Sequence, residues 1–330
     1  FPQVLDPEMG AVFQNYLEGE DLNFMLDTKV EKILVNEEGK VSGVQTNKGD
    51  VDAQLVLVAV GVRPCVKLAV DAGLEVEKAI IINDHCQTSD PDIYAAGDCV
   101  MTTNLISGQR VYAPMGSTAN RQGRVIGNNV TGGDDTHKGV LNTAVCKMFD
   151  WSLGATGLSE RVAKQLGYDT VTCIVPGPDI THFMPGKKLI MTRLLADRKT
   201  RKILGVQIVG PGKVDKRIDT MVAALTFGAT VDDLANMDLS YAPPLSSAME
   251  NLTNAANVMK NTIDGKAHDM RYEEFKSKLD SDDVVFVDLR TAHERSQKPI
   301  PAKNQLHIPI EELRARANEV PKDKEVVVFC

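Results

Sequence analysis

The sequence predicts an α/β protein built from more than one domain. The segment Leu55–Val60 is apolar at every position, which is typical of a strand that a sheet buries on both faces. Ile93–Asp98 has the pattern of a second buried strand, closing on small residues and an acid. A new succession of helix and strand patterns occupies residues 273–330. A length of 330 residues is enough for two or three domains with their own cores.

The first elements in order are a helix and a hairpin. The helix is predicted to run from Asp6, which can cap it, to Gly19, which can end it, with Pro7 in its first turn. Alternating side chains and glycine-bearing turns then predict strands at 28–36 and 41–46.

The next elements belong to the α/β pattern. The strand Leu55–Val60 ends in the turn Gly61–Pro64, where glycine permits close backbone approach and proline sets a sharp exit. A short β segment, Ala79–Asn83, leads to the strand Ile93–Asp98. A helix is predicted from Ala113 to about Asn129.

The pattern changes to mixed α+β from about Thr143 to Met259. Strands are predicted near residues 144–149, 171–176, 188–195 and 203–209. Helices are predicted at residues 159–166, 213–227 and 246–261. The polar stretch Lys266–Tyr272 is a predicted linker to the last unit.

Composition excludes several functional classes. A formal net charge of −8, without long charged runs, argues against nucleic acid or an anionic membrane as the main partner. No apolar run approaches the roughly 18 residues of a transmembrane helix. The six cysteines lack regular spacing and indicate reduced thiols in the cytoplasm. The histidines are isolated, so no metal site is expected.

The first candidate site lies at the end of the second apolar strand. Gly97 allows a ligand to approach the backbone, and Asp98 can accept hydrogen bonds from ribityl or ribose hydroxyls. Ala113 and Pro114 begin a helix, with Pro114 expected at its first position, and its N-terminus can stabilise negative charge. The alternative is a tight strand-to-loop turn with a capping aspartate.

Three ordered motifs together resemble the flavin-dependent pyridine nucleotide-disulfide oxidoreductases. They are Tyr94-Ala-Ala-Gly-Asp98, Gly61-Val-Arg-Pro64 and Asn120-Arg-Gln-Gly-Arg124, and the resemblance covers roughly residues 1–262. It implies that the Gly97–Asp98 step holds FAD. It also implies that the helix after Ala113-Pro114 points its N-terminus at the pyrimidine edge of the flavin. The turn at Gly61 would close the NAD(P)-binding domain.

The resemblance also implies a domain order. Residues 1–62 would be the C-terminal half of an NAD(P)-binding domain and 63–135 the C-terminal part of an FAD-binding domain, followed by a dimerisation domain at 140–262. The sequence has no GxGxxG motif, whereas the family has two. Both motifs and the flavin-side cysteine are therefore expected upstream of Phe1, and the choice between NADH and NADPH stays open.

Tyr241-Ala-Pro-Pro-Leu-Ser-Ser247 indicates a branch of this family. The glutathione-reductase branch has a catalytic histidine in this region, and no histidine lies within the motif here. The Tyr-Ala-Pro-Pro step resembles the coenzyme A-disulfide and polysulfide reductases, in which Tyr241 would stabilise a thiolate or donate a proton across a homodimer interface. The alternative is a buried structural tyrosine.

The terminal segment 270–330 resembles part of a rhodanese domain. The resemblance rests on Val287-Asp-Leu-Arg290, His307-Ile-Pro309, the helix start at Glu311 and the strand Val326–Cys330. It implies that Cys330 is the sulfur nucleophile, while Asp288 and Arg290 pair structurally. The alternative for Cys330 is a buried strand cysteine.

The complete set of expectations is an α/β protein with partial FAD- and NAD(P)-binding three-layer domains, an α+β dimerisation domain and a partial rhodanese-like α/β domain. The predicted function is an FAD-dependent NAD(P)H reductase of CoA-disulfide, CoA-persulfide or polysulfide, with coenzyme A as substrate or ligand and a rhodanese sulfur-transfer module. The alternatives are an NADH oxidase or peroxidase on the same scaffold, or a non-catalytic fragment that dimerises.

Overall fold

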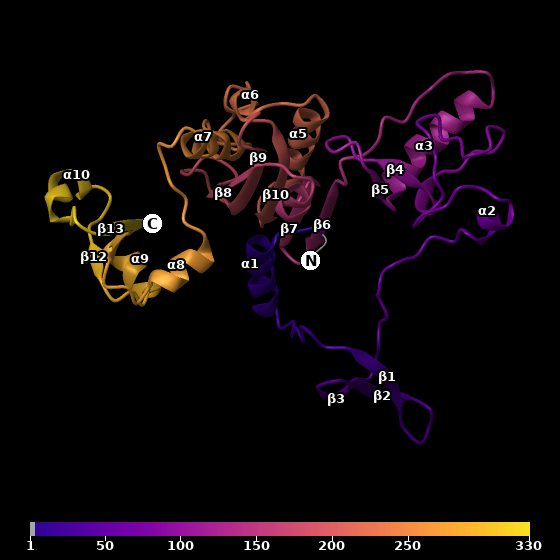
Figure 1. Cartoon of the computed structure of the whole chain (residues 1–330). Coiled ribbons are helices and arrows are strands. Elements are labelled where there is room, and N and C mark those ends of the chain that lie inside the picture. Colours follow the sequence, from indigo (N-terminus) through magenta and orange to yellow (C-terminus); the bar gives the residue numbers. More distant parts are fainter. Residues whose placement is uncertain (1–3) are drawn as a thin grey trace. The chain divides into compact units, whose positions relative to one another are not determined.

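The computed structural model describes residues 4–330 and divides the chain after Asp264 (Figure 1). The first compact unit ends at Asp264, and the second runs from Gly265 to Cys330.

The first helix forms where the sequence predicted it. Helix α1, Pro7–Glu18, buries one face through residues spaced four apart, Met9, Phe13 and Leu17. These side chains pack against Leu153 and other residues of the large sheet. Asp6 occupies the N-cap position, but the prediction that its side chain caps the helix is wrong.

The Asp6 carboxylate is instead used in a buried charged network. It accepts a hydrogen bond from Gln207 Nε2 at 2.8 Å and lies 3.2 Å from the guanidinium of Arg193. Arg193 also pairs with Glu8, at 3.2 Å, and with Glu160. The buried guanidinium of Arg193 therefore joins Asp6 and Glu8, at the start of α1, to Glu160.

The predicted hairpin is confirmed and gains a third strand. Strands β1, Val30–Val35, and β2, Val41–Thr46, pair antiparallel, and β3, Gly49–Asp52, adds to β2. Asn36 Oδ1 accepts from two backbone N–H groups of the turn, and Gly39 has a φ of 77°, which glycine adopts readily.

Both predicted buried strands are absent. Leu55, Leu57 and Val60 are 85%, 87% and 91% exposed, and their segment forms no strand. Ile93–Asp98 makes one isolated bridge, at Tyr94. An apolar pattern becomes a strand only when a neighbour satisfies its backbone, and no described strand pairs with either segment. The β segment 79–83 is likewise limited to bridges at Ile80.

The part of the chain that contains the first candidate site is built from short elements. In order they are α2 (Lys67–Asp71), the 3₁₀ turn η1 (Gly97–Cys99), β4 (Met101–Thr103), β5 (Arg110–Tyr112) and α3 (Gly116–Asn129). Ala69, Ile80 and Val100 form a small core beneath them. The predicted helix start is wrong by three residues: Met115 is the N-cap, so Pro114 precedes the helix instead of occupying its first position.

The large sheet of the first unit is antiparallel, with strand order β6-β7-β10-β9-β8. The strands are β6 (Ala144–Met148), β7 (Trp151–Gly157), β8 (Thr170–Pro178), β9 (Leu189–Asp197) and β10 (Ile203–Gly210). Helices α4 (Glu160–Gln165), α5 (Val214–Thr226), α6 (Val231–Ala235) and α7 (Asn251–Ile263) complete the α+β region. Strand β7 and helix α6 were not predicted, and α7 begins five residues later than expected.

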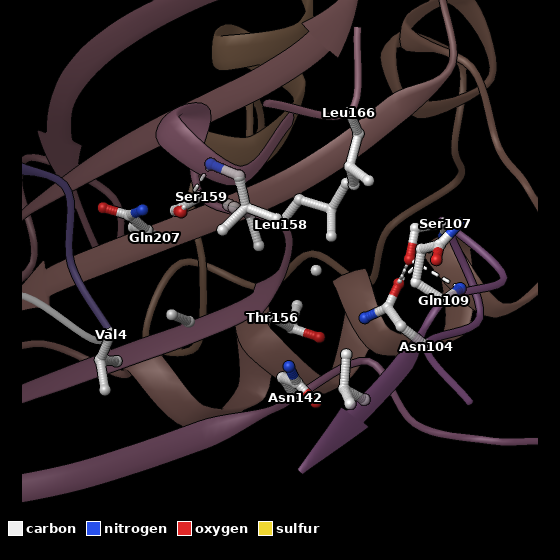
Figure 2. A pocket seen from close by; sticks show the side chains of 15 residues that line it. Val4, Asn104, Ser107, Gln109, Asn142, Thr156, Leu158, Ser159, Leu166 and Gln207 are labelled. Carbon is white, nitrogen blue, oxygen red and sulfur yellow. Dashed lines mark hydrogen bonds between the residues drawn. The ribbon is translucent and has the colours of Figure 1, made fainter. Parts of the chain in front are cut away.

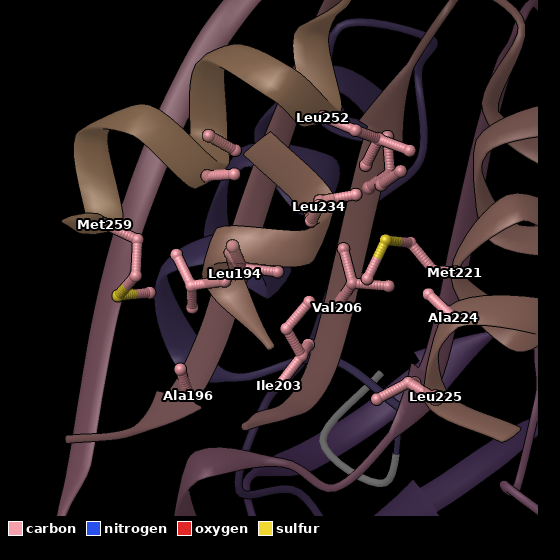
Figure 3. Packing of buried hydrophobic residues seen from close by; sticks show 14 of the residues in the cluster. Leu194, Ala196, Ile203, Val206, Met221, Ala224, Leu225, Leu234, Leu252 and Met259 are labelled. Carbon is pink, nitrogen blue, oxygen red and sulfur yellow. The ribbon is translucent and has the colours of Figure 1, made fainter. Parts of the chain in front are cut away.

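The sheet is covered on both faces because strand side chains alternate. Val206 of β10 packs in the same cluster as Met221 of α5 (Figure 3). Ile208 belongs to this cluster too, whereas Val209 lies in the cluster of α1. Every residue of β10 is therefore buried. This two-sided cover explains why apolar residues occupy both faces of β10 in an antiparallel sheet.

The second unit is a small parallel α/β fold. Its elements are α8 (Tyr272–Lys278), β11 (Val284–Asp288), α9 (Ala292–Gln297), β12 (Gln305–His307), α10 (Leu313–Arg316), η2 (Ala317–Glu319) and β13 (Glu325–Phe329). The strand order is β12-β11-β13, with both pairings parallel. The fully buried strand of this sheet is β11, between its two neighbours.

Candidate functional site

Gly97 and Asp98 lie in the turn η1, which packs against the first two turns of α3. Gly97 has a φ of 83°, a backbone conformation that is strained for residues other than glycine. A β-carbon there would lie 3.4 Å from that of Ala119, so the close approach itself is ordinary. The backbone conformation therefore explains the glycine, and it leaves Asp98 exposed at the turn.

Gln122 fixes this turn to the helix. Its side chain is fully buried, and its Oε1 accepts the backbone N–H of Gly97 at 2.8 Å. Its Nε2 has no hydrogen-bond partner among the described residues. A buried donor without an acceptor is costly, so this amide is suited to a ligand or water oxygen beside Gly97.

The N-terminus of α3 is open. No side chain caps its first turn, and Gly116 and Ser117 are exposed. The N-cap residue Met115 donates its backbone N–H to the carbonyl of Ala113 at 2.9 Å, which holds the approach through Pro114. The free N–H groups of a helix N-terminus favour negative charge.

Three features of this region bear on whether it can hold FAD. Asp98 offers an exposed carboxylate for hydroxyl groups, Gln122 offers an unpartnered donor, and α3 offers a positive helix end. All three lie on segments joined by the contact between η1 and α3. The residues fit a hydroxyl-rich cofactor with an anionic part.

Gly61 is not brought to this site. Its φ is 88°, as its glycine identity allows, but it is exposed, and nothing described would contact a β-carbon at this position. The turn Gly61–Pro64 lies in the same unpaired stretch as Leu55–Val60. Its predicted role in cofactor binding stays a prediction.

Tyr241 lies on the loop between α6 and α7, in the part of the first unit formed by the large sheet and its helices, here called the large sheet domain. The alternative of a buried structural tyrosine is wrong. Its side chain is 51% exposed. The loop is held from below, because Ser246, fully buried, donates its hydroxyl to the carbonyl of Ser240 at 2.6 Å. Thr181 donates its N–H to the carbonyl of Pro243 and its hydroxyl to that of Ser246. The ring is thus presented to solvent from a fixed backbone.

Buried charges support the same loop. Arg217 of α5 is fully buried, pairs with Glu250 and donates to the carbonyls of Lys213 and Asp179. The side chain of Lys213 in turn lies 3.4 Å from the carbonyls of Pro244 and Leu245. Arg217 therefore holds the segments at Asp179 and Lys213, which contact the Tyr241 loop. Sequence reasoning missed it, because a single arginine in a helix carries no local signal of burial.

Cys330 is exposed and directly follows β13. Its role as sulfur nucleophile stays a prediction. The structural pairing of Asp288 with Arg290 is confirmed: the buried Asp288 carboxylate accepts from Arg290 Nε at 2.9 Å and from Nη2 at 2.8 Å. These hydrogen bonds from Arg290 hold the pKa of Asp288 below its usual value. Hydrogen bonding to Asp288 raises the pKa of Arg290, with a small further contribution from Cys330.

Arg290 is also placed over the last strand. Its guanidinium lies 5.3 Å from the ring centroid of Phe329, and its carbonyl is 2.8 Å from Nε2 of His307.

The predicted residues thus occupy separate places. Gly97, Asp98, Ala113 and Pro114 share the η1–α3 site, Tyr241 belongs to the large sheet domain, and Cys330 lies in the second unit. Gln122 was missed as a site residue, although it lies within the motif Asn120–Arg124. Within residues 4–330, no group of three potential ligands is arranged for a metal ion, and no helix is long and apolar enough to cross a membrane.

A glycine–acid turn packed against a helix with an open N-terminus, followed by an α+β domain, is typical of α/β proteins that bind dinucleotide cofactors. Family profiles agree: residues 1–123 match the pyridine nucleotide-disulphide oxidoreductase profile and residues 143–253 match the dimerisation domain of the same family. The chain belongs to the pyridine nucleotide-disulphide oxidoreductase family.

Individual relatives narrow the comparison. An NADH oxidase of Methanocaldococcus jannaschii is 39% identical over 256 residues, 77% of this chain and 56% of the relative. An NAD(P)H coenzyme A polysulfide/persulfide reductase of Pyrococcus horikoshii is 37% identical over 73% of this chain and 55% of the relative. The solved structure of an NAD-dependent persulfide reductase from A. fulgidus has a TM-score of 0.92 and 41% identity, covering 100% of this chain and 59% of that one.

The chain spans little more than half the length of the curated relatives it matches. The family depends on FAD and NAD(P)H, and CoA as a substrate fits its CoA-persulfide and CoA-disulfide reductase members.

Proposed function

We propose that the chain is part of an NAD(P)H- and FAD-dependent reductase of CoA-persulfide, CoA-disulfide or polysulfide. The observation that carries the proposal is Tyr241, half-exposed on a loop that buried side chains hold in place. A hydroxyl fixed in this way can donate a hydrogen bond or proton to a sulfur leaving group. The relatives from Pyrococcus horikoshii and A. fulgidus, whose names specify persulfide reduction, support the same choice of substrate.

The η1–α3 site would bind the flavin. In this proposal Asp98 accepts hydrogen bonds from cofactor hydroxyls, Gln122 donates to an oxygen beside Gly97, and the N-terminus of α3 stabilises anionic charge. FAD, when bound, would supply the two-electron chemistry that links NAD(P)H to the sulfur substrate. Gly61 would lie where the chain returns from the NAD(P)-binding part.

The proposed reaction with CoA-persulfide balances without a further reactant. Two electrons and one proton from NAD(P)H, with one proton from solvent, break the sulfur–sulfur bond and leave CoA thiol and hydrogen sulfide. Tyr241 would donate a hydrogen bond or a proton to the thiolate that forms when this bond breaks. Its exposure suits a homodimer through residues 140–262, in which the loop of one copy completes the site of the other. The six free cysteines suit a reducing compartment, which we propose to be the cytoplasm.

The second unit would add a rhodanese-type sulfur-transfer module with Cys330 as nucleophile. The parallel sheet β12-β11-β13, the exposed thiol after β13 and the neighbouring Arg290 support this proposal. The structural similarity to the A. fulgidus persulfide reductase extends over this unit as well.

A sulfur-transfer assay tests the module. With thiosulfate and cyanide, we expect Cys330→Ser to abolish thiocyanate formation, because sulfur must pass through the thiolate. Cys146→Ser, which changes an exposed cysteine in the large sheet domain, should leave the rate unchanged. Equal rates in wild type and Cys330→Ser would refute the role of Cys330.

A second candidate is an NADH oxidase or peroxidase, which the relative from Methanocaldococcus jannaschii favours. Stopped-flow reoxidation of the reduced, flavin-loaded protein separates the candidates. We expect CoA-persulfide to reoxidise the flavin at least about tenfold faster than air-saturated buffer, since the proposed role of the Tyr241 hydroxyl assists cleavage of a sulfur–sulfur bond. Faster reoxidation by oxygen alone would support the oxidase instead. A purified protein that dimerises but has no visible flavin absorbance would support a non-catalytic role.

A further inference from the structure

A cavity of about 240 Å³ lies between the β4–β5 connection and the large sheet (Figure 2). Its aliphatic walls come mainly from Leu158, Val162, Leu166 and Val206. Strand β7 contributes Ala155 and Thr156. At roughly 30 Å³ per water molecule, this volume has room for about eight waters, or for a small organic molecule of similar size.

The side chains that line the cavity are uncharged. None of the lining residues is Lys, Arg, His, Asp or Glu. A charged ligand would lose its hydration without gaining an opposite charge, which is strongly unfavourable. The cavity is therefore suited to a neutral molecule.

One polar group in this wall has no partner. Asn104 is 1% exposed, and its Nδ2 makes no hydrogen bond with any described residue. Figure 2 shows this nitrogen directed toward Thr156 and the open centre of the cavity, away from Ser107 and Gln109. The wall thus presents one buried NH₂ group that lacks an acceptor oxygen.

The orientation of the Asn104 amide is determined by its other end. Oδ1 accepts from the backbone N–H groups of Ile106 and Ser107, each at 3.0 Å, and from the Ser107 hydroxyl at 3.2 Å. A flipped amide would set NH₂ against two N–H donors, so the NH₂ group must face the cavity. The turn that holds Asn104 is docked on the sheet domain, where the carbonyl of Ile106 accepts from the Tyr168 hydroxyl at 3.4 Å.

Two neighbouring polar groups are already hydrogen-bonded to other residues. Thr156 Oγ1 already hydrogen-bonds to Thr143 at 2.8 Å, and the Gln207 amide is used by Asp6. We propose that the cavity is a binding site for a small neutral compound that carries a carbonyl oxygen. Its oxygen accepts from Asn104 Nδ2, and its apolar body packs against Leu158 and Val162. This site is separate from the η1–α3 site and does not depend on the redox function.

The test uses isobutyramide as probe and isobutyrate as its anionic counterpart of the same shape. Ligand-observed saturation-transfer NMR on the full chain should give a Kd for isobutyramide of about 1–10 mM, as expected for so small a ligand. Isobutyrate should bind at least about tenfold more weakly, because no cationic side chain lines the cavity.

Asn104→Asp is the discriminating variant. The new carboxylate keeps an oxygen for the turn N–H groups and replaces the donor by an acceptor, so isobutyramide should bind at least about tenfold more weakly. Gln109→Glu makes the same chemical change at an exposed lining residue and should alter the Kd by less than about twofold.

A second variant acts without changing the turn. Ala155→Leu inserts side-chain volume into the cavity and should abolish probe binding while the fluorescence of Trp151 stays native. Three results would overturn the proposal: no saturable binding of isobutyramide up to about 100 mM, equal affinity for both probes, or unchanged affinity in both Asn104→Asp and Ala155→Leu.

Discussion

Replacing Arg217 by methionine should lower the free energy of unfolding of the sheet domain by about 3–5 kcal/mol. Arg217 is fully buried, and its removal leaves the carboxylate of Glu250, only 3% exposed, without its cation. The carbonyls of Asp179 and Lys213 lose their donor at the same time. Urea unfolding followed by tryptophan fluorescence measures this domain, because the single tryptophan, Trp151, lies in β7.

Two controls identify the cause of this loss. The double variant Arg217→Met/Glu250→Gln should recover most of the stability, since a neutral amide needs no cation and can still accept from the N–H of Leu252. Arg198→Met, which removes an exposed arginine 3.9 Å from Asp169, should change stability by less than about 1 kcal/mol. If Arg217→Met were no less stable than Arg198→Met, the buried pair would have no structural importance.

Substituting Tyr241 by phenylalanine should slow reduction of CoA-persulfide by about 10²-fold, the lower end of what a positioned proton donor contributes. The substitution removes one hydroxyl from a half-exposed ring and leaves the anchored loop intact. In the flavin-loaded protein, reduction by NAD(P)H should proceed at the wild-type rate, because in the proposed reaction the hydroxyl acts only on the sulfur substrate. Stopped-flow measurement of the two half-reactions separately gives both rates.

Tyr272→Phe is the matched control, since it removes a hydroxyl from an exposed tyrosine in the second unit. It should change neither half-reaction. An equal slowing of both half-reactions by Tyr241→Phe would assign Tyr241 a structural role, and wild-type rates in both would remove it from the mechanism.

Local sequence signals predicted much of the backbone. Helix α1 follows from Pro7 and Gly19, and the β1–β2 hairpin follows from its glycine turn and its alternating side chains. The positive φ of Gly97 agrees with a residue chosen for its backbone freedom. These features depend on neighbours within a few residues, which the sequence contains.

The failures share a different cause. Leu55–Val60 has the pattern of a buried strand but is exposed, because a strand needs a hydrogen-bonded neighbour that its own pattern does not specify. Asp6 was expected to cap α1 and instead joins Arg193, which lies far along the chain in β9. Both outcomes depend on which distant segments meet.

The sequence by itself determined the family, the helix and hairpin positions and the identity of the candidate residues Gly97, Asp98, Tyr241 and Cys330. Only the tertiary structure decided that Gln122 braces Gly97, that Arg217 supports the Tyr241 loop and that Asn104 directs an unpartnered amide into a cavity. Burial and hydrogen-bond satisfaction are properties of packed segments, so an isolated Gln, Arg or Asn in the sequence carries no sign of them.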